Sequence, residues 1–146
     1  MADVSFIAPA TGHHVRLLIV EDSALIRKVT HLAFPSREHE LQEAENGLEA
    51  LAILDAVMQP FDAILQDLRM PGMNGVEFIH ALRQRAPHRE TPVVVATSEK
   101  ETSELVQDAR RLGVAAVVKK PWKPQELAML VQQACASRRL PGGERT

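Results

Sequence analysis

The sequence predicts an α/β fold in which a doubly wound parallel sheet of five strands carries five helices on its two faces. Short runs of apolar, mostly β-branched residues alternate with longer segments whose apolar residues recur at helical spacing, from Val15 to about Ser137. Strict alternation of this kind is typical of a parallel sheet with right-handed crossovers and helices on both faces. A chain of 146 residues also fits a single domain with a substantial core.

The predicted strands are short apolar segments bounded by polar or turn-forming residues. In chain order they are Val15–Val20, Glu40–Ala44, Ala63–Gln66, Pro92–Ala96 and Ala115–Lys119. The helices predicted between and after them are Ser23–Phe34, Leu48–Met58, Gly75–Arg85, Thr102–Leu112 and Pro124–Ser137. Asp22 or Ser23 can cap the first helix, and Pro124 suits the first turn of the last one.

Two of these helices have a clear apolar face. The predicted buried residues are Leu25, Val29 and Leu32 in the first helix and Leu127, Leu130, Val131 and Ala134 in the last. Residues 1–14 show no periodicity and are predicted to form a flexible N-terminal tail. Residues 15–137 then make up the domain, and residues 138–146, with their Pro and Gly, a flexible C-terminal tail.

Composition excludes several classes of partner. The formal net charge is −2, so no global basic field favours nucleic acid or a membrane surface. Cys135 is the single cysteine, which agrees with a reducing compartment. No apolar run approaches the roughly 20 residues of a membrane-spanning helix, and the first fourteen residues do not read as a signal peptide. We therefore expect a cytoplasmic protein.

Acidic residues stand where two of the predicted strands end. Glu21 and Asp22 follow LLIV, and Asp67 follows AILQ. Because parallel strands present their carboxyl ends to one crevice, these side chains are expected to meet. Clustered carboxylates repel each other unless a cation joins them, and oxygen ligands suit Mg²⁺.

Two other strand ends supply a hydroxyl and an ammonium. Thr97 ends the fourth predicted strand, and Lys119 and Lys120 end the fifth. Because successive strand side chains point to opposite faces, only one of the two lysines can reach the crevice. Acids, a hydroxyl and an ammonium together suit a phosphoryl group beside a metal.

These pieces, in this order, resemble the receiver domain of bacterial two-component response regulators, single-domain chemotaxis type. The matching motifs are Glu21-Asp22, Asp67 followed by MPGMNG, Thr97-Ser98 and Lys120-Pro121-Trp122. The resemblance covers almost everything from Val15 to about Ser137. It implies a flavodoxin-like fold with strand order 2-1-3-4-5.

By this resemblance, Asp67 is the phosphoacceptor, which takes a phosphoryl group from a sensor histidine kinase or a histidine phosphotransfer protein in a phosphorelay. Asp22 and Asp67 would bind Mg²⁺ directly, Glu21 through water, and Arg69 through its backbone carbonyl. Metal and ammonium would together offset the charge of the anion that Asp67 attacks.

The resemblance also assigns the remaining groups. Lys120 would pair with a phosphoryl oxygen, because the family's cis Lys-Pro step, here at Pro121, selects it over Lys119. Thr97 would hydrogen-bond another phosphoryl oxygen and move when phosphate arrives. Signal would then pass to a protein target through the fourth helix, the last strand and the last helix. Such a domain modifies itself and is not a turnover enzyme.

Three positions depart from the family pattern. Val117 stands where the family usually has a switch Tyr or Phe, so we expect switching to run mainly through the loop after Thr97. Arg69 and Glu99, two residues after Asp67 and Thr97, flank the path of the hydrolytic water in the family. We expect these opposite charges to face each other across the site and modulate phosphate lifetime.

Other readings are less well supported. A haloacid-dehalogenase-like phosphatase needs a second Asp two residues after the nucleophile, where this chain has Arg69. A Rossmann domain needs a glycine-rich first turn, which VEDSA lacks. A phosphorylation-independent module would be suggested by a missing Asp or Lys, and a DNA-binding regulator needs a further domain after Ser137. A receiver domain cut from a hybrid histidine kinase or a larger regulator remains the alternative.

Overall fold

The parallel sheet has five strands in the computed structural model, which describes residues 14–139. The strands are β2 (Arg16–Val20), β3 (Glu40–Ala44), β4 (Ala63–Gln66), β5 (Val93–Thr97) and β6 (Ala116–Lys119). They pair in the order β3-β2-β4-β5-β6, and every pairing is parallel. The predicted fold class and the strand order 2-1-3-4-5 are therefore confirmed.

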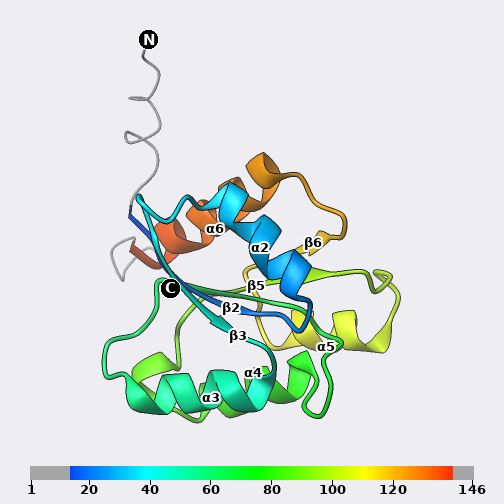
Figure 1. Ribbon diagram of the computed structural model, residues 1–146. Helices are drawn as coiled ribbons and strands as arrows, with labels where there is room; N and C mark the ends of the chain where they lie inside the picture. Colours follow the sequence, from blue (N-terminus) through cyan, green and yellow to red (C-terminus); the bar gives the residue numbers. More distant parts are fainter. Residues whose placement is uncertain (1–13, 140–146) are drawn as a thin grey trace.

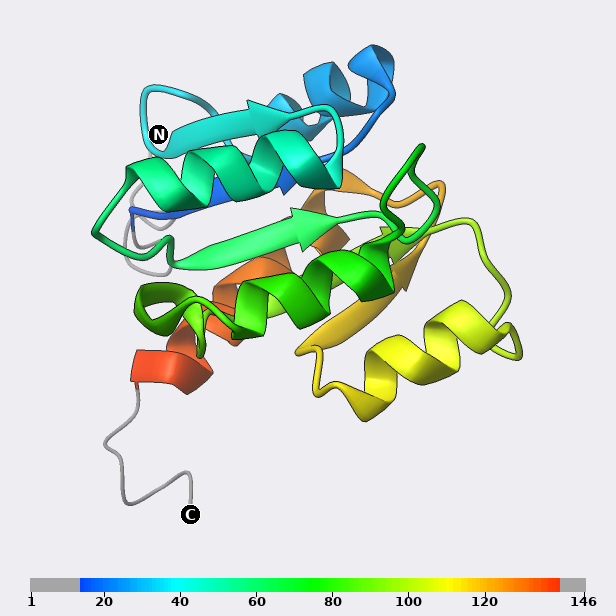
Figure 2. The ribbon, with the colours of Figure 1, turned by 90° about the horizontal axis from the view of Figure 1, so that it is seen from below.

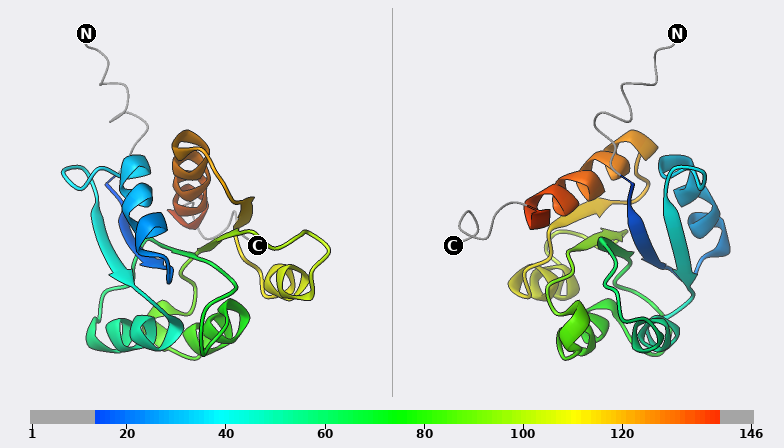
Figure 3. Two further views of the ribbon diagram at one scale, coloured as in Figure 1. Left: turned by 45° about the vertical axis from the view of Figure 1, so that its right-hand side comes forward. Right: turned by 90° about the vertical axis from the view of Figure 1, so that its left-hand side faces the viewer.

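Helices cover both faces of this sheet. They are α2 (Ala24–Ala33), α3 (Gly47–Ala56), α4 (Gly75–Arg83), α5 (Glu104–Arg111) and α6 (Pro124–Arg139). Figure 1 shows α2 and α6 together on one face and α3, α4 and α5 on the other. Figure 2 shows the second layer from outside, and Figure 3 shows the sheet between the two layers.

The sheet separates two hydrophobic cores because its side chains alternate between the faces. On β4, Ile64 packs toward α3 and α4, whereas Leu65 packs toward α6. Phe78 of α4 belongs to the first core and Val131 of α6 to the second, and both are completely buried. With both faces covered, the carboxyl-end edge of the sheet is left for polar side chains.

The buried face of α2 differs from the prediction. Leu25 and Leu32 are 67% and 69% exposed, while Thr30 is buried and bonds through Oγ1 to the carbonyl of Ile26. Arg27 also lies on the inner side, with its side chain only 14% exposed. The inner side of this helix holds polar groups that have partners in the protein, and hydropathy spacing cannot detect such partners.

The other helices and strands lie within about two residues of their predicted bounds, with one addition. A 3₁₀ turn, η1 (Ala86–His88), follows α4, and the ring of its buried His88 contacts the carbonyl oxygen of Leu54 at 3.0 Å. The predicted tails fall mostly outside the described residues. Within the described part of the chain, no helix is long and apolar enough to cross a membrane.

The ring of His39 gives the fold a testable pH dependence. His39 is 9% exposed, its Nδ1 accepts the N–H of Val15 at 3.0 Å, and its ring meets Phe34 edge-on at 5.6 Å. Burial lowers the pKa of His39, the charge of Glu38 opposes this, and His14 adds to it. The folded state therefore favours the neutral ring, whose Nδ1 has a free lone pair.

We expect stability to fall as the pH drops below about 6.5, because the unfolded chain then binds a proton that the folded chain resists. The fall should level off once the folded ring is protonated. His39→Gln keeps an acceptor for Val15 and removes the titration, so its loss of stability between pH 7.5 and 5.5 should be smaller. Urea unfolding at several pH values measures this. Parallel pH profiles for the two proteins would contradict it.

Candidate functional site

Asp67 lies directly after β4, in the middle of the carboxyl-end edge. Its N–H donates to the carbonyl of Val20 at 3.2 Å, which continues the β2–β4 pairing and fixes where the side chain begins. Its carboxylate is held at both oxygens: Oδ1 accepts the N–H of Leu68 at 2.6 Å, and Oδ2 accepts the ammonium of Lys120 at 2.8 Å. Asp67 is 8% exposed and so remains open to solvent on one side.

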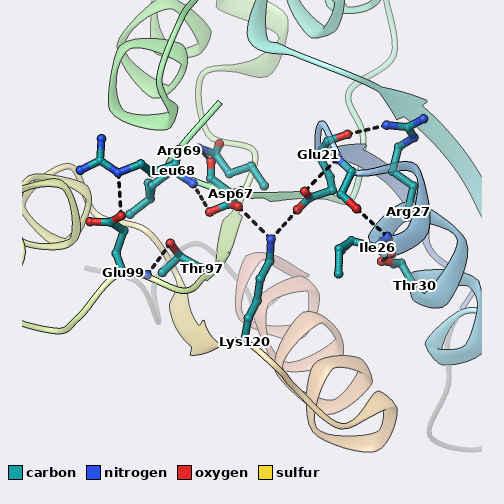
Figure 4. A network of polar contacts seen from close by, with 12 residues as sticks. Glu21, Ile26, Arg27, Thr30, Asp67, Leu68, Arg69, Thr97, Glu99 and Lys120 are labelled. Atoms are coloured by element: carbon teal, nitrogen blue, oxygen red, sulfur yellow. Dashed lines mark hydrogen bonds and ion pairs between the residues drawn. The ribbon is translucent and has the colours of Figure 1, made fainter. Parts of the chain in front are cut away.

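Lys120 joins the two acidic strand ends. Its Nζ donates to Asp67 Oδ2 and to Glu21 Oε1, each at 2.8 Å (Figure 4). Lys119 is exposed, as the alternation of strand side chains requires. Burial lowers the pKa of Lys120, but the hydrogen bonds and charges of Asp67 and Glu21 outweigh it and raise the pKa above its ordinary value. The ammonium is therefore a fixed positive charge.

Glu21 is held at its side chain and its main chain. Oε2 accepts the N–H of Ser23 at 3.1 Å, and the N–H of Glu21 donates to the carbonyl of Ala44 at 3.0 Å. Burial raises the pKa of the Glu21 carboxyl, and the contacts with Lys120 and Ser23 only partly oppose this. Asp22, the other member of the acid pair, is exposed, and Ser23 is the residue that caps α2.

Thr97, Arg69 and Glu99 lie on the side of Asp67 away from Glu21. Arg69 and Glu99 are the two charges predicted to face each other. Thr97 is 1% exposed, and its Oγ1 accepts the N–H of Glu99 at 3.1 Å. Arg69 Nε donates to Glu99 Oε2 at 2.7 Å, with Arg69 71% and Glu99 18% exposed. Figure 4 shows this pair beside Asp67 and Thr97, so the charges meet as expected from the sequence.

A clamp below the site was not predicted. Gln66, 1% exposed, donates from Nε2 to the carbonyls of Asp67 at 3.3 Å and Gly75 at 3.1 Å, while the N–H of Gly75 donates to the carbonyl of Leu68 at 2.8 Å. These bonds close the loop that carries Arg69. An isolated Gln at the end of an apolar strand gives little sign of such a role.

The residues fit a divalent cation by donor type and by charge. Lys120 offsets one of the three negative charges of Glu21, Asp22 and Asp67, and one Mg²⁺ would balance the charge of −2 that remains. Within residues 14–139, no group of three or more His, Cys, Asp or Glu side chains is arranged to hold a metal. The predicted ligand set requires only Asp22, Asp67 and the Arg69 carbonyl, with water completing the shell, as is usual for Mg²⁺.

The segment after β6 borders a hollow beside Lys120. The Lys120–Pro121 peptide bond is cis. The hollow has a volume of about 310 Å³ and is lined by Ile26, Val29, Ser98, Lys120, Pro121 and Trp122. Val117 is half-buried on β6 and packs into the core on the α3–α5 side.

The sequence model of the response regulator receiver domain matches residues 17–132. The chain belongs to this family. Receiver domains are signalling domains of two-component systems and not classical enzymes.

Individual proteins similar to this chain are also response regulators. Chemotaxis protein CheY1 of Helicobacter pylori is 32% identical over 114 residues, which is 77% of this chain and 90% of CheY1. Transcriptional regulatory protein ResD of Bacillus subtilis is 31% identical over 120 residues, and the chain spans only 48% of its length. The solved structure of the chemotaxis response regulator CheY4 of Vibrio cholerae superposes with a TM-score of 0.73 at 32% identity, over 83% of this chain and 98% of that one.

Replacing Gly75 with alanine tests the clamp. A Cβ there would lie 2.5 Å from the carbonyl oxygen of Asp67 and 2.8 Å from Leu68 Cα, and backbone atoms cannot easily yield. We expect Gly75→Ala to lower the free energy of unfolding by about 1–3 kcal/mol. Gly47→Ala is the matched control, because the three atoms nearest to its Cβ would all belong to the flexible side chain of Met73. Urea unfolding compares them, and equal stabilities would contradict the clamp.

Proposed function

We propose that this receiver domain accepts a phosphoryl group on Asp67 from a phosphohistidine of a sensor histidine kinase or a histidine phosphotransfer protein. The observation that carries the proposal is the contact of Lys120 Nζ with both Asp67 and Glu21, at 2.8 Å each. It places a fixed cation at a carboxylate that is partly open to solvent. A cation there reduces the repulsion between a carboxylate and an incoming phosphoryl anion.

In the proposed reaction, a carboxylate oxygen of Asp67 bonds to phosphorus while the phosphorus–nitrogen bond of the phosphohistidine breaks. The imidazole leaves with the bonding electron pair, and the product is an aspartyl phosphate. The Leu68 N–H, at 2.6 Å from Oδ1, fixes the orientation of the carboxylate before attack. Lys120 and the hydroxyl of Thr97 would contact two oxygens of the transferred group.

A magnesium ion belongs to this proposal as the second source of positive charge. It would be held by Asp22, Asp67 and the Arg69 carbonyl, with Glu21 acting through water, and would neutralise charge on the phosphoryl oxygens. A receiver domain of a Pseudomonas aeruginosa sensor histidine kinase, which shares the fold at 22% identity with a TM-score of 0.74, has a magnesium ion in its active-site cleft.

The surface of α2 is the proposed docking site for the phosphodonor. Leu25 and Leu32 are exposed apolar residues, and the hollow lined in part by Ile26 and Trp122 lies between that helix and Lys120. A helical phosphodonor could cover this apolar surface while its histidine approaches Asp67. Output to a downstream protein target would use α5, β6 and α6.

Switching is proposed to run through the loop after Thr97. The Thr97 hydroxyl would donate its proton to a phosphoryl oxygen while its Oγ1 still accepts the Glu99 N–H at 3.1 Å, so a movement of Thr97 would carry Glu99 and the loop with it. Val117 is half-buried among apolar residues and has neither ring nor hydroxyl, so it offers no second polar partner. The added charge of about −1.5 to −2 would then bias the loop.

Phosphorylation at Asp67 is directly testable. With acetyl phosphate and Mg²⁺, the wild-type chain should gain one acid-labile, hydroxylamine-sensitive phosphate, and Asp67→Asn should lose essentially all of it. Asp55→Asn is the matched control, because Asp55 is an exposed carboxylate paired with Arg85 far from the site. Addition of EDTA should abolish labelling. Equal labelling of Asp67→Asn would refute the proposal.

The Arg69–Glu99 pair is proposed to lengthen the life of the phosphate. The two side chains meet at 2.7 Å beside Asp67, where the pair would cover the side from which water attacks, and its guanidinium would also bind phosphoryl oxygens. Arg69→Ala and Glu99→Ala should shorten the half-life about two- to fivefold, the range that an exposed pair worth up to 1 kcal/mol allows.

Decay of label after removal of acetyl phosphate measures this half-life. Arg85→Ala is the control, because Arg85 forms an ion pair with Asp55 away from the site. Unchanged or slower decay in both site variants would show that the pair does not protect the phosphate.

A further inference from the structure

Arg27 is a second cation that contacts the acid pair, and it does so through the main chain. Its Nη1 donates to the carbonyl oxygen of Glu21 at 2.7 Å, and its Nε donates to Glu43 Oε1 at 3.0 Å. The side chain is 14% exposed. Figure 4 shows the guanidinium reaching from α2 to the main chain of Glu21.

We propose that Arg27 is a positioning residue that sets the affinity of the site for Mg²⁺ by fixing the peptide between Glu21 and Asp22. This inference rests on the proposed function. Because the peptide group is planar, a hydrogen bond to the Glu21 carbonyl also fixes the direction in which Asp22 leaves the strand. Asp22 is exposed and makes no hydrogen bond to another side chain within the described residues, so its place depends on its main chain.

Glu43 makes this bond rigid. It lies on β3, next to β2 in the sheet, and its other oxygen accepts Nε2–H of His31 at 2.7 Å. The hydrogen bond from His31 lowers the pKa of Glu43, burial opposes it, and Arg27 lowers it further. The guanidinium is thus anchored to an ionised carboxylate on one strand while it holds the end of the next. Only a planar, forked donor reaches both acceptors in fixed geometry.

Positioning and simple electrostatics predict opposite signs when Arg27 is neutralised. Loss of a positive charge near a cation site should tighten Mg²⁺ binding, because repulsion between like charges is removed. Loss of a positioning contact should weaken it, because Asp22 no longer starts in the binding orientation. Groups that hydrogen-bond to metal ligands and orient them typically contribute about 10–100-fold to metal affinity.

The experiment is a Mg²⁺ titration of the full chain and Arg27→Met, which keeps the stem and removes every donor. Calorimetry, or the fluorescence of Trp122, the single tryptophan, gives the dissociation constant. We expect it to rise about tenfold. Arg85→Met is the matched control, because Arg85 likewise bonds a carboxylate, Asp55, and a backbone carbonyl, that of Ala81, but lies away from the site. Its dissociation constant should be unchanged.

Two further readouts separate positioning from a loss of stability. Without metal, amide hydrogen exchange at Ser23, whose N–H donates to Glu21, should be faster in Arg27→Met. With Mg²⁺ far above the new dissociation constant, the rate of labelling at Asp67 should return to the wild-type value. If Arg27→Met does not fold, Arg27→Lys replaces it, and its dissociation constant should rise severalfold.

An unchanged or lower dissociation constant in a folded variant would overturn the inference while leaving the proposed function intact. Failure of the wild-type chain to label at Asp67 would instead refute the proposed function.

Discussion

The contact of one ammonium with two carboxylates determines how the carboxyl-end edge of the sheet is built. The side chains of Lys120, Asp67 and Glu21 are 13%, 11% and 7% exposed. Charges this far from water are tolerated only when they are paired, and removal of one partner from such a set typically costs about 3–5 kcal/mol. From the end of β6, the side chain of Lys120 extends past β5 and contacts the carboxylates that follow β4 and β2. The N–H of Lys120 donates to the Thr97 carbonyl at 2.9 Å, which draws the lysine toward that end.

This constraint extends into α2. The helix begins where Ser23 caps it and also donates to Glu21, so its rotation is tied to the acid pair. Arg27 then points inward to the Glu21 carbonyl and to Glu43. The same rotation leaves Leu25 and Leu32 exposed at the surface. The apolar surface proposed to meet a phosphodonor is therefore a consequence of how the acid pair is held.

The sequence was sufficient for the features that repeat or that lie next to each other in the chain. Alternation of apolar segments predicted the strands. Strand ends predicted that the acids would share a crevice with one of Lys119 and Lys120, and the family resemblance selected Lys120. The sequence was insufficient where a side chain contacts a residue that is distant in the chain and lies on another element. The inward turn of Arg27, the clamp of Gln66 on Gly75 and the exposure of Leu25 depend on contacts between separate elements, which hydropathy spacing does not encode.

Of the hydrogen bonds around Asp67, some must change when it is phosphorylated and others can remain. Two of the three N–H donors of Lys120 serve Glu21 and Asp67, so under the proposed function the third can meet a phosphoryl oxygen without breaking either bond. Thr97 accepts from Glu99 through its oxygen, which leaves its proton to be donated. Only Arg69 has to choose between Glu99 and the phosphoryl group. Because that pair is exposed and worth at most about 1 kcal/mol, the proposed switch changes a weak contact and leaves the buried ones in place.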